Sequence, residues 1–201
     1  RKGLNTHEIA DTIHAFLTSI GKKESMFSLL SYSIGAKFAL AILQEYPSKI
    51  NKAYFIAADG LENNIVLKIC SGKHINNWLL KLVYNPKILN YILNTLYKTH
   101  YIDHTLHRIL TFEFSTQEYR MISYKTITYY SRLKFDRQHL ANLINQNHIE
   151  THFFFGKKDK LFPAGIATRF GKLLTQPNVH IFDEGHELIN DKLSTYLKNL
   201  I

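Results

Sequence analysis

Short runs of apolar residues alternate with amphipathic helical patterns in this chain, and this alternation constrains the fold most strongly. Residues 26–32 and 52–57 are nearly continuous apolar runs, which is typical of strands buried on both faces of a sheet. Helical patterns cover residues 5–20 and 35–46, and the second ends at Pro47. Strands that alternate with crossover helices pair in parallel. The sequence therefore predicts an α/β fold with a mostly parallel sheet flanked by helices.

The same alternation returns at the C-terminal end of the chain. It consists of a strand, a helix, a strand and a final helix, at residues 152–155, 164–174, 179–182 and 190–201. A length of 201 residues suits one domain with a sizeable core. We therefore assign residues 1–60 and 147–201 to a single α/β core.

The region between these two blocks has a different character. Residues 61–146 contain several helical patterns and little of the period-two alternation that strands show. This region also carries 11 Lys and Arg against 5 Asp and Glu. A helical stretch inserted into an α/β sheet protein indicates a cap or lid, so we expect residues 61–146 to form one.

The overall charge is positive, at +9, but it does not indicate a nucleic-acid partner. Lysine is frequent along the whole chain, as are Asn, Ile, Phe and Tyr, and no dense block of Lys and Arg occurs. No apolar run reaches the roughly 18 residues that a membrane-spanning helix needs. We therefore expect no nucleic-acid partner and no membrane span, and a small-molecule ligand is the more fitting partner.

Two further features bear on the origin of the chain. Cys70 is the only cysteine, so no internal disulfide can form, which favours a reducing, cytoplasmic compartment. The sequence opens on Arg1 within a helical pattern rather than on Met. We therefore expect a piece of a longer protein.

The turn after the first strand carries the strongest chemical signal. Ser33 lies between small residues at Ser31 and Gly35, where a strand runs directly into a helix. A serine on so sharp a turn stands exposed above the sheet, and bulky neighbours two positions away would obstruct it. The N–H of Ile34, at the start of the helix, would be one donor to a developing oxyanion. This pattern indicates a nucleophile.

A serine hydroxyl needs a base, and the base needs a carboxylate that orients it. Asp159 follows the strand that ends at Gly156, and His186 follows the strand that ends at Phe182. Both positions come after the carboxyl ends of strands, where ligand sites of open α/β sheets lie. Because these ends meet at one edge of a parallel sheet, we expect the two side chains to lie near Ser33.

These segments resemble the signatures of the α/β-hydrolase family, with the turn at 31–35, the segment 156–163 and the pair Gly185-His186. The likeness leaves out the cap and covers about two-thirds of the chain. It implies that Ser33 is the nucleophile, Asp159 the acid and His186 the base of a serine hydrolase. It also implies that no cofactor is needed and that the reaction cleaves an ester, an amide or a related bond. Serine as the nucleophile argues against the dehalogenase and epoxide-hydrolase branches, which use Asp there.

The sequence also departs from this family. The family pattern has glycine where this chain has Ser31, and the turn arrives too early, so the first strands of the usual sheet are missing. The second oxyanion N–H, usually marked by His-Gly in an early loop, has no counterpart before Ser33. We therefore expect an exposed sheet edge and an incomplete oxyanion site. The alternative hypothesis is a non-catalytic binding protein built on the same scaffold.

A second aspartate competes for the role of the acid. Asp59 also follows a strand of the sheet, but the flanking residues of Asp159 fit the family pattern better. Asp183 and Glu184 are too near His186 in sequence, and we interpret them as solvated loop charges.

The central region contains other residues with chemical potential. His100, His104 and His107 have the spacing of one helix face, which could bind zinc, but no acidic or Cys partner has a helpful spacing. We therefore expect no metal. Arg120 and Arg132 could reach an anionic group of a substrate, although a solvated surface position is the more common role.

Overall fold

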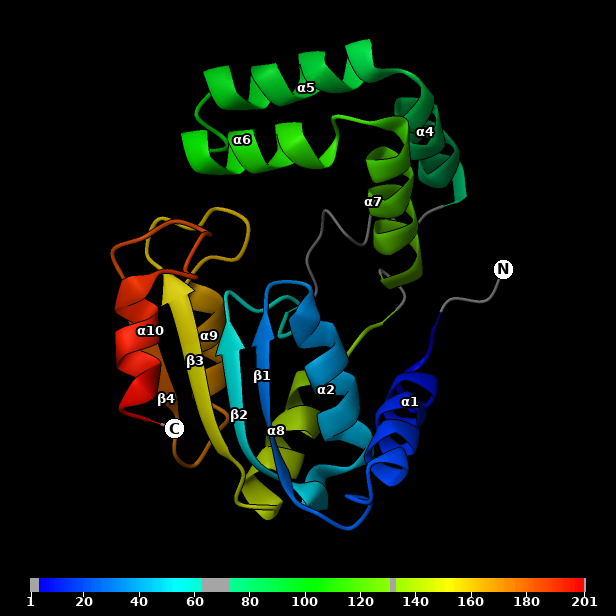
Figure 1. The fold of residues 1–201 in the computed structure, drawn as a ribbon. Coiled ribbons are helices and arrows are strands. Elements are labelled where there is room, and N and C mark those ends of the chain that lie inside the picture. The colour runs from blue at the N-terminus through cyan, green and yellow to red at the C-terminus, as the bar shows by residue number, and fades with distance from the viewer. Residues whose placement is uncertain (1–3, 63–72, 131–132, 201) are drawn as a thin grey trace.

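The computed structural model describes residues 4–62, 73–130 and 133–200 of the 201-residue chain. Cys70 and Arg132 lie outside these described residues. The described part contains a four-stranded sheet in the order β1-β2-β3-β4, and all neighbouring strands are parallel (Figure 1). The strands are β1 (Phe27–Tyr32), β2 (Ile50–Ile56), β3 (Glu150–Gly156) and β4 (Asn178–Phe182). The predicted α/β fold with a parallel sheet is confirmed.

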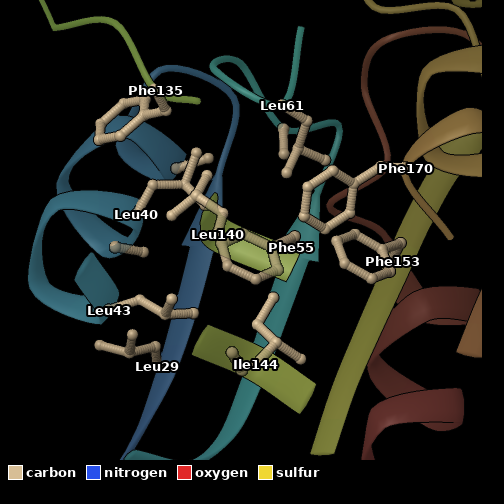
Figure 2. Packing of buried hydrophobic residues seen from close by; sticks show 14 of the residues in the cluster. Leu29, Leu40, Leu43, Phe55, Leu61, Phe135, Leu140, Ile144, Phe153 and Phe170 are labelled. Atoms are coloured by element: carbon tan, nitrogen blue, oxygen red, sulfur yellow. The ribbon is translucent and has the colours of Figure 1, made fainter. Parts of the chain in front are cut away.

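Helices cover both faces of this sheet. They are α1 (Thr6–Ser19), α2 (Gly35–Glu45), α8 (Arg137–Gln146), α9 (Gly165–Gly171) and α10 (Asp191–Lys198), with a short 3-10 turn at Pro47–Lys49. The first four pack on one face, around Phe55 and Phe153, and Figure 2 shows Leu140 beside Phe55 and Phe170 beside Phe153. Helix α10 covers part of the other face, where Leu193 joins Tyr54, Ile56 and Phe154. Alternate residues of β2 thus point to opposite layers.

Local sequence signals explain where the elements near the N-terminus begin and end. Asn5 and Glu8 form the predicted capping box of α1, with side chain to backbone distances of 2.9 and 3.0 Å. Just after α1, Gly21 adopts a φ of 69°, which glycine tolerates without a steric penalty. Helix α2 ends just before Pro47, as a proline requires. These signals fix the length of the two elements that frame β1.

The central region forms helices that stand beyond the carboxyl ends of the strands (Figure 1). They are α4 (Lys73–Tyr84), α5 (Pro86–Lys98), α6 (His104–Glu113) and α7 (Gln117–Tyr130). Their own small cluster of buried residues is Leu82, Leu89 and Leu93. Helix α8 behaves differently, because Leu140 and Ile144 are buried in the main core together with Leu133. We therefore propose that the cap ends before Leu133 rather than at residue 146.

The strand β1 lies at one edge of the sheet. Within the described residues it pairs only with β2, and Leu30, at its centre, is 59% exposed. The predicted exposed edge is therefore present. None of the described helices has both the length and the apolar character that crossing a membrane would require.

A chain of hydrogen bonds links the sheet to α10 on the side away from the main core. The Nε2 of His152 lies 2.8 Å from a carboxylate oxygen of Glu150, and its Nδ1 lies 3.2 Å from Nε2 of His180. The other ring nitrogen of His180 lies 3.0 Å from the hydroxyl of Tyr196. Because a carboxylate only accepts, neutral His152 donates to Glu150 and accepts from His180, which in turn accepts from Tyr196. Burial, and then the neighbouring His152, lower the pKa of His180.

This lowered pKa predicts a loss of stability in mild acid. The folded state disfavours the protonated form of His180, so stability is present above the ordinary pKa of 6.5 and is lost as the pH falls below it. The urea midpoint should therefore fall between about pH 7.5 and pH 5.5. His180→Asn should show a smaller fall over that interval. An equal fall in the variant would contradict the assignment of this acid sensitivity to the histidine pair.

Candidate active site

Ser33 occupies the sharp turn between β1 and α2. Its φ of 51° is positive, which is uncommon for a residue other than glycine. The turn is held from both sides: the N–H of Ser33 donates to the carbonyl of Ile56 at 2.9 Å, and its carbonyl accepts from the N–H of Asp59 at 3.1 Å. Residues at the end of β2 thus hold the backbone in this conformation. Strained backbone that is held in this way is concentrated at functional sites.

The small residues on either side of Ser33 have different roles. Ser31 is buried, and its hydroxyl donates to the carbonyl of Tyr54 at 3.3 Å, so serine is accommodated where the family pattern has glycine. A Cβ added at Gly35 would meet no atom within 4 Å. Alanine, which is also small, would therefore fit at this position.

The side chains of Ser33, His186 and Asp159 form one hydrogen-bonded row. The Oγ of Ser33 lies 3.1 Å from Nε2 of His186, and Nδ1 of His186 lies 2.8 Å from Oδ2 of Asp159. Because the ionised carboxylate only accepts, the proton of a neutral imidazole lies on Nδ1. The lone pair of Nε2 then faces the serine hydroxyl. This arrangement has the geometry of a nucleophile, a base and an orienting acid.

Asp159 is buried, with a side chain that is 0% exposed, and its two carboxylate oxygens divide their partners. Oδ1 accepts from the backbone N–H groups of Leu161 and Phe162, at 2.8 and 3.0 Å. This leaves Oδ2 for His186. The loop after β3 therefore both stabilises the carboxylate and fixes its direction.

Two aromatic rings fix the position of the imidazole, and sequence reasoning did not single them out. Tyr32 stacks on His186 with ring centroids 5.5 Å apart, and Phe162 lies at the same distance in a tilted orientation. The hydroxyl of Tyr32 also donates to the carbonyl of His186 at 3.2 Å. Burial, followed by the charges of Glu187 and Asp159, raises the pKa of Tyr32. Both rings lie within the motif segments 31–35 and 156–163, and this position is the sequence signal that could have indicated them.

The loops that carry the acid and the base contact each other through their backbones. The N–H of Lys158 donates to the carbonyl of Glu184 at 2.9 Å. At Gly156 an added Cβ would lie 2.2 Å from the carbonyl oxygen of Gly185 and 2.5 Å from that of Glu184. Only glycine allows this approach, because the neighbouring atoms are backbone and cannot rotate away.

Gly156→Ala is therefore expected to push the two loops apart. The strain should lower the free energy of unfolding by about 1–3 kcal/mol, the usual cost of overpacking, and should separate Asp159 from His186. Urea unfolding measures the first effect. Gly35→Ala is the matched control, because an added Cβ meets open space there. Equal stability of the two variants would contradict the close approach of these loops.

Asp59, the competing acid, lies elsewhere in the site. It is buried, and one carboxylate oxygen lies 3.4 Å from Nζ of Lys37, which is also buried. Lys37 in turn donates to the carbonyl of Tyr130 at 3.2 Å, at the end of cap helix α7. Burial raises the pKa of the Asp59 carboxyl, although Lys37 opposes this shift. Asp59 therefore belongs to a buried ion pair with α2, whose lysine also contacts the end of α7, and His186 pairs with Asp159 instead.

Of the two loop charges near His186, Asp183 is solvated as expected, whereas Glu184 is half-buried. Asp183 is exposed and pairs with Lys158 at 2.9 Å, and Glu184 pairs with Lys192 at 2.8 Å.

The three cap histidines do not share one helix face. His100 lies in the turn after α5 with a φ of 56°, and α6 begins only at His104. His107 lies 3.0 Å from a side-chain oxygen of Asn94, and its ring stacks on Tyr97. The helical spacing was therefore misleading, because a turn interrupts it. Across the described residues, no group of three or more His, Cys, Asp or Glu side chains could hold a metal ion.

Arg120 is a structural residue, contrary to the expectation of a solvated or ligand-binding position. Its guanidinium is buried and donates to the carbonyls of Val83, Phe114 and Ser115 at 2.7, 2.9 and 3.3 Å. It thereby joins α4 to the turn between α6 and α7.

A cavity of about 150 Å³ lies beside His186, between α6 of the cap and the loop after β4. Leu106 and Ile109 line it from the cap, together with Asp103 and Thr105, and residues 184–187 line it from the core. Asp103 caps α6 through the N–H of Leu106 at 2.8 Å, and its carboxylate comes close to Gly185. Helix α6 therefore borders the space next to the candidate base.

The N–H of Ile34 is the candidate oxyanion donor of this site. Ile34 is the N-cap residue of α2, where an amide has no partner within the helix. The positive end of the helix dipole adds to its ability to bind a negative charge.

Solved structures share this architecture. A thermophilic esterase from Thermogutta terrifontis matches with a TM-score of 0.66 and 11% identity, over 98% of this chain and 74% of that chain. An esterase from Exiguobacterium antarcticum matches with a TM-score of 0.61 and 17% identity, over 99% and 73%. A probable hydrolytic enzyme from Pseudomonas aeruginosa matches with a TM-score of 0.63 and 16% identity, over 100% and 70%. No protein-family model and no curated protein matches the sequence.

The chain therefore has the α/β-hydrolase fold, as its sequence predicted. A likeness at this level of identity concerns the fold, so the roles of the individual side chains rest on the geometry of this chain.

Proposed function

We propose that this chain is a serine hydrolase that cleaves an ester, an amide or a related acyl bond of a small molecule. The observation that carries the proposal is the row from Ser33 through His186 to Asp159, with distances of 3.1 and 2.8 Å. The positive φ of Ser33 supports it, because ordinary packing does not require a serine in that conformation. The esterase names of two structural neighbours make esters the first substrates to test.

The chemistry follows from the order of the three side chains. Nε2 of His186 takes the proton of the Ser33 hydroxyl while Oγ attacks the substrate carbonyl. Asp159 keeps the imidazole oriented and stabilises its positive charge. The tetrahedral intermediate collapses, His186 gives its proton to the leaving oxygen or nitrogen, and an acyl-enzyme remains on Ser33. Water, activated by the same imidazole, then releases the acid and restores the serine.

The developing oxyanion would lie near the N–H of Ile34. Removal of one oxyanion donor typically lowers turnover by about 10²–10³.

A non-catalytic binding protein built on the same fold is the second candidate function. Ser31 no longer argues for it, because its buried hydroxyl has a partner in the fold. The two functions differ in turnover: a binding protein would retain a small ester without cleaving it.

A chain-length series of p-nitrophenyl esters tests the proposal. Hydrolysis that Ser33→Ala abolishes, with a preference for one acyl length, would support it. Release of p-nitrophenol at the same rate by the Ser33→Ala variant, or no release above buffer for any ester, would contradict it.

A further inference from the structure

The part of the cap farthest from the sheet is basic and contains no acidic residue. No Asp or Glu occurs between Glu62 and Asp103, a stretch that includes α4 and α5. Three lysines of this stretch, Lys81, Lys87 and Lys98, are exposed. In Figure 1, α5 forms the outer edge of the molecule, on the opposite side of the cap from the sheet. The lysines of this stretch therefore have no acidic neighbour within the stretch itself.

The same edge exposes large apolar and aromatic side chains. Tyr84, at the end of α4, is 60% exposed, and Ile88 and Tyr91 are 48% and 73% exposed. Ile88 and Tyr91 are three residues apart within α5 and therefore lie on one side of that helix. Trp78, on α4, is 49% exposed. The packing of the cap uses other residues, since Leu82, Leu89 and Leu93 form its buried cluster. Packing within the cap therefore does not account for the exposed set.

We propose that this surface docks onto an anionic lipid surface. It is called here the cap face, and it consists of Trp78, Lys81, Tyr84, Lys87, Ile88, Tyr91 and Lys98. Tyrosine and tryptophan rings are suited to the boundary between headgroups and acyl chains, and lysines attract anionic headgroups. A helix with an apolar and aromatic side flanked by Lys lies in the plane of such an interface.

The composition of the cap face favours lipid over nucleic acid. A nucleic-acid groove would require dense Lys and Arg along a phosphate backbone, whereas the cap face carries three lysines and no arginine. Ile88 would gain nothing from phosphates, but it would gain an apolar environment at a lipid surface. The proposal does not depend on the hydrolase mechanism, because none of these residues belongs to the row at Ser33.

The chain carries its own reporter for this interaction. Trp78 is its only tryptophan and lies in the cap face. When the chain is mixed with phosphatidylcholine vesicles containing about a third phosphatidylserine, Trp78 emission should shift to the blue and the chain should co-sediment. Pure phosphatidylcholine should bind at least about tenfold more weakly, and added salt should weaken the anionic binding. No binding to either vesicle would overturn the proposal.

Matched variants separate the cap face from the general attraction of a basic chain. Ile88→Ser with Tyr91→Ser, and separately Lys87→Glu, should each weaken vesicle binding by about tenfold or more. Phe16→Ser and Lys22→Glu are the controls, in α1 and just after it, where Phe16 is 58% exposed and Lys22 is exposed. They should change binding by less than about twofold. Thermal unfolding of every variant checks that the fold persists.

The controls also define the failure of the proposal. Lys22→Glu alters the net charge as much as Lys87→Glu does. Equal losses of vesicle binding in the two variants would show that the overall charge causes the attraction. This result would overturn the proposal that the cap face is the docking surface. The proposal would also be overturned if the chain bound single-stranded or duplex nucleic acid, and if Lys87→Glu removed that binding but left vesicle binding intact.

Discussion

Asp159→Asn is expected to lower the turnover of a cleavable ester by about 10⁴ while the fold persists. The carboxylate accepts from Nδ1 of His186 at 2.8 Å and keeps the lone pair of Nε2 toward Ser33. An amide would offer its NH₂ to the ring and favour the wrong tautomer. Steady-state kinetics measure the loss, and circular dichroism checks that the variant is folded.

Asp183→Asn is the matched control for this variant. Asp183 lies three residues before His186, but it is exposed and pairs with Lys158. Its substitution should leave turnover within about twofold, because exposed ion pairs contribute little. Equal losses at Asp159 and Asp183 would contradict the assignment of the acid.

Asp59→Asn is expected to have its effect on stability instead. The side chains of Asp59 and Lys37 are 4% and 5% exposed, so the substitution leaves a buried ammonium without its carboxylate. Loss of one partner of a buried ion pair typically costs about 3–5 kcal/mol. Urea unfolding should show a loss of this size, and the folded variant should retain most of its activity, because His186 keeps Asp159.

The double variant Lys37→Met with Asp59→Leu isolates the cause. Burial raises the pKa of the Asp59 carboxyl, so desolvation opposes its charge even beside Lys37. Replacement of both groups by apolar side chains should therefore recover most of the lost stability. A double variant as unstable as Asp59→Asn would show that the charge of Lys37 is not the cause. A large loss of activity in folded Asp59→Asn would return Asp59 to consideration as the acid.

Local sequence signals were sufficient to predict the helices and strands that frame the site. The capping box at Asn5, the break at Pro47 and the apolar runs of the strands gave their positions to within a few residues. Because the carboxyl ends of parallel strands share one edge, the loops after β1, β3 and β4 could be expected to meet. The structure brings Ser33, Asp159 and His186 together at that edge.

The remaining features depend on contacts that no local pattern specifies. An amphipathic pattern shows that α8 has a buried side, but not that this side packs on α2 and the main core. A lysine within α2 gives no sign of a buried partner at Asp59. The contact between His152 and His180 depends on the register of β3 and β4, which pairs His152 with Asn178. The spacing of His100, His104 and His107 suggested one helix, but the structure has a turn at His100.

The central claim is that Ser33 is a nucleophile activated by His186, and covalent labelling tests it most directly. The chain is incubated with a fluorophosphonate, digested, and the adduct is located by mass spectrometry. The proposed mechanism predicts one adduct, on Ser33, which Ser33→Ala abolishes and His186→Ala strongly slows. An adduct that persists in Ser33→Ala, or a chain that remains unlabelled when a known serine hydrolase is labelled, would contradict it.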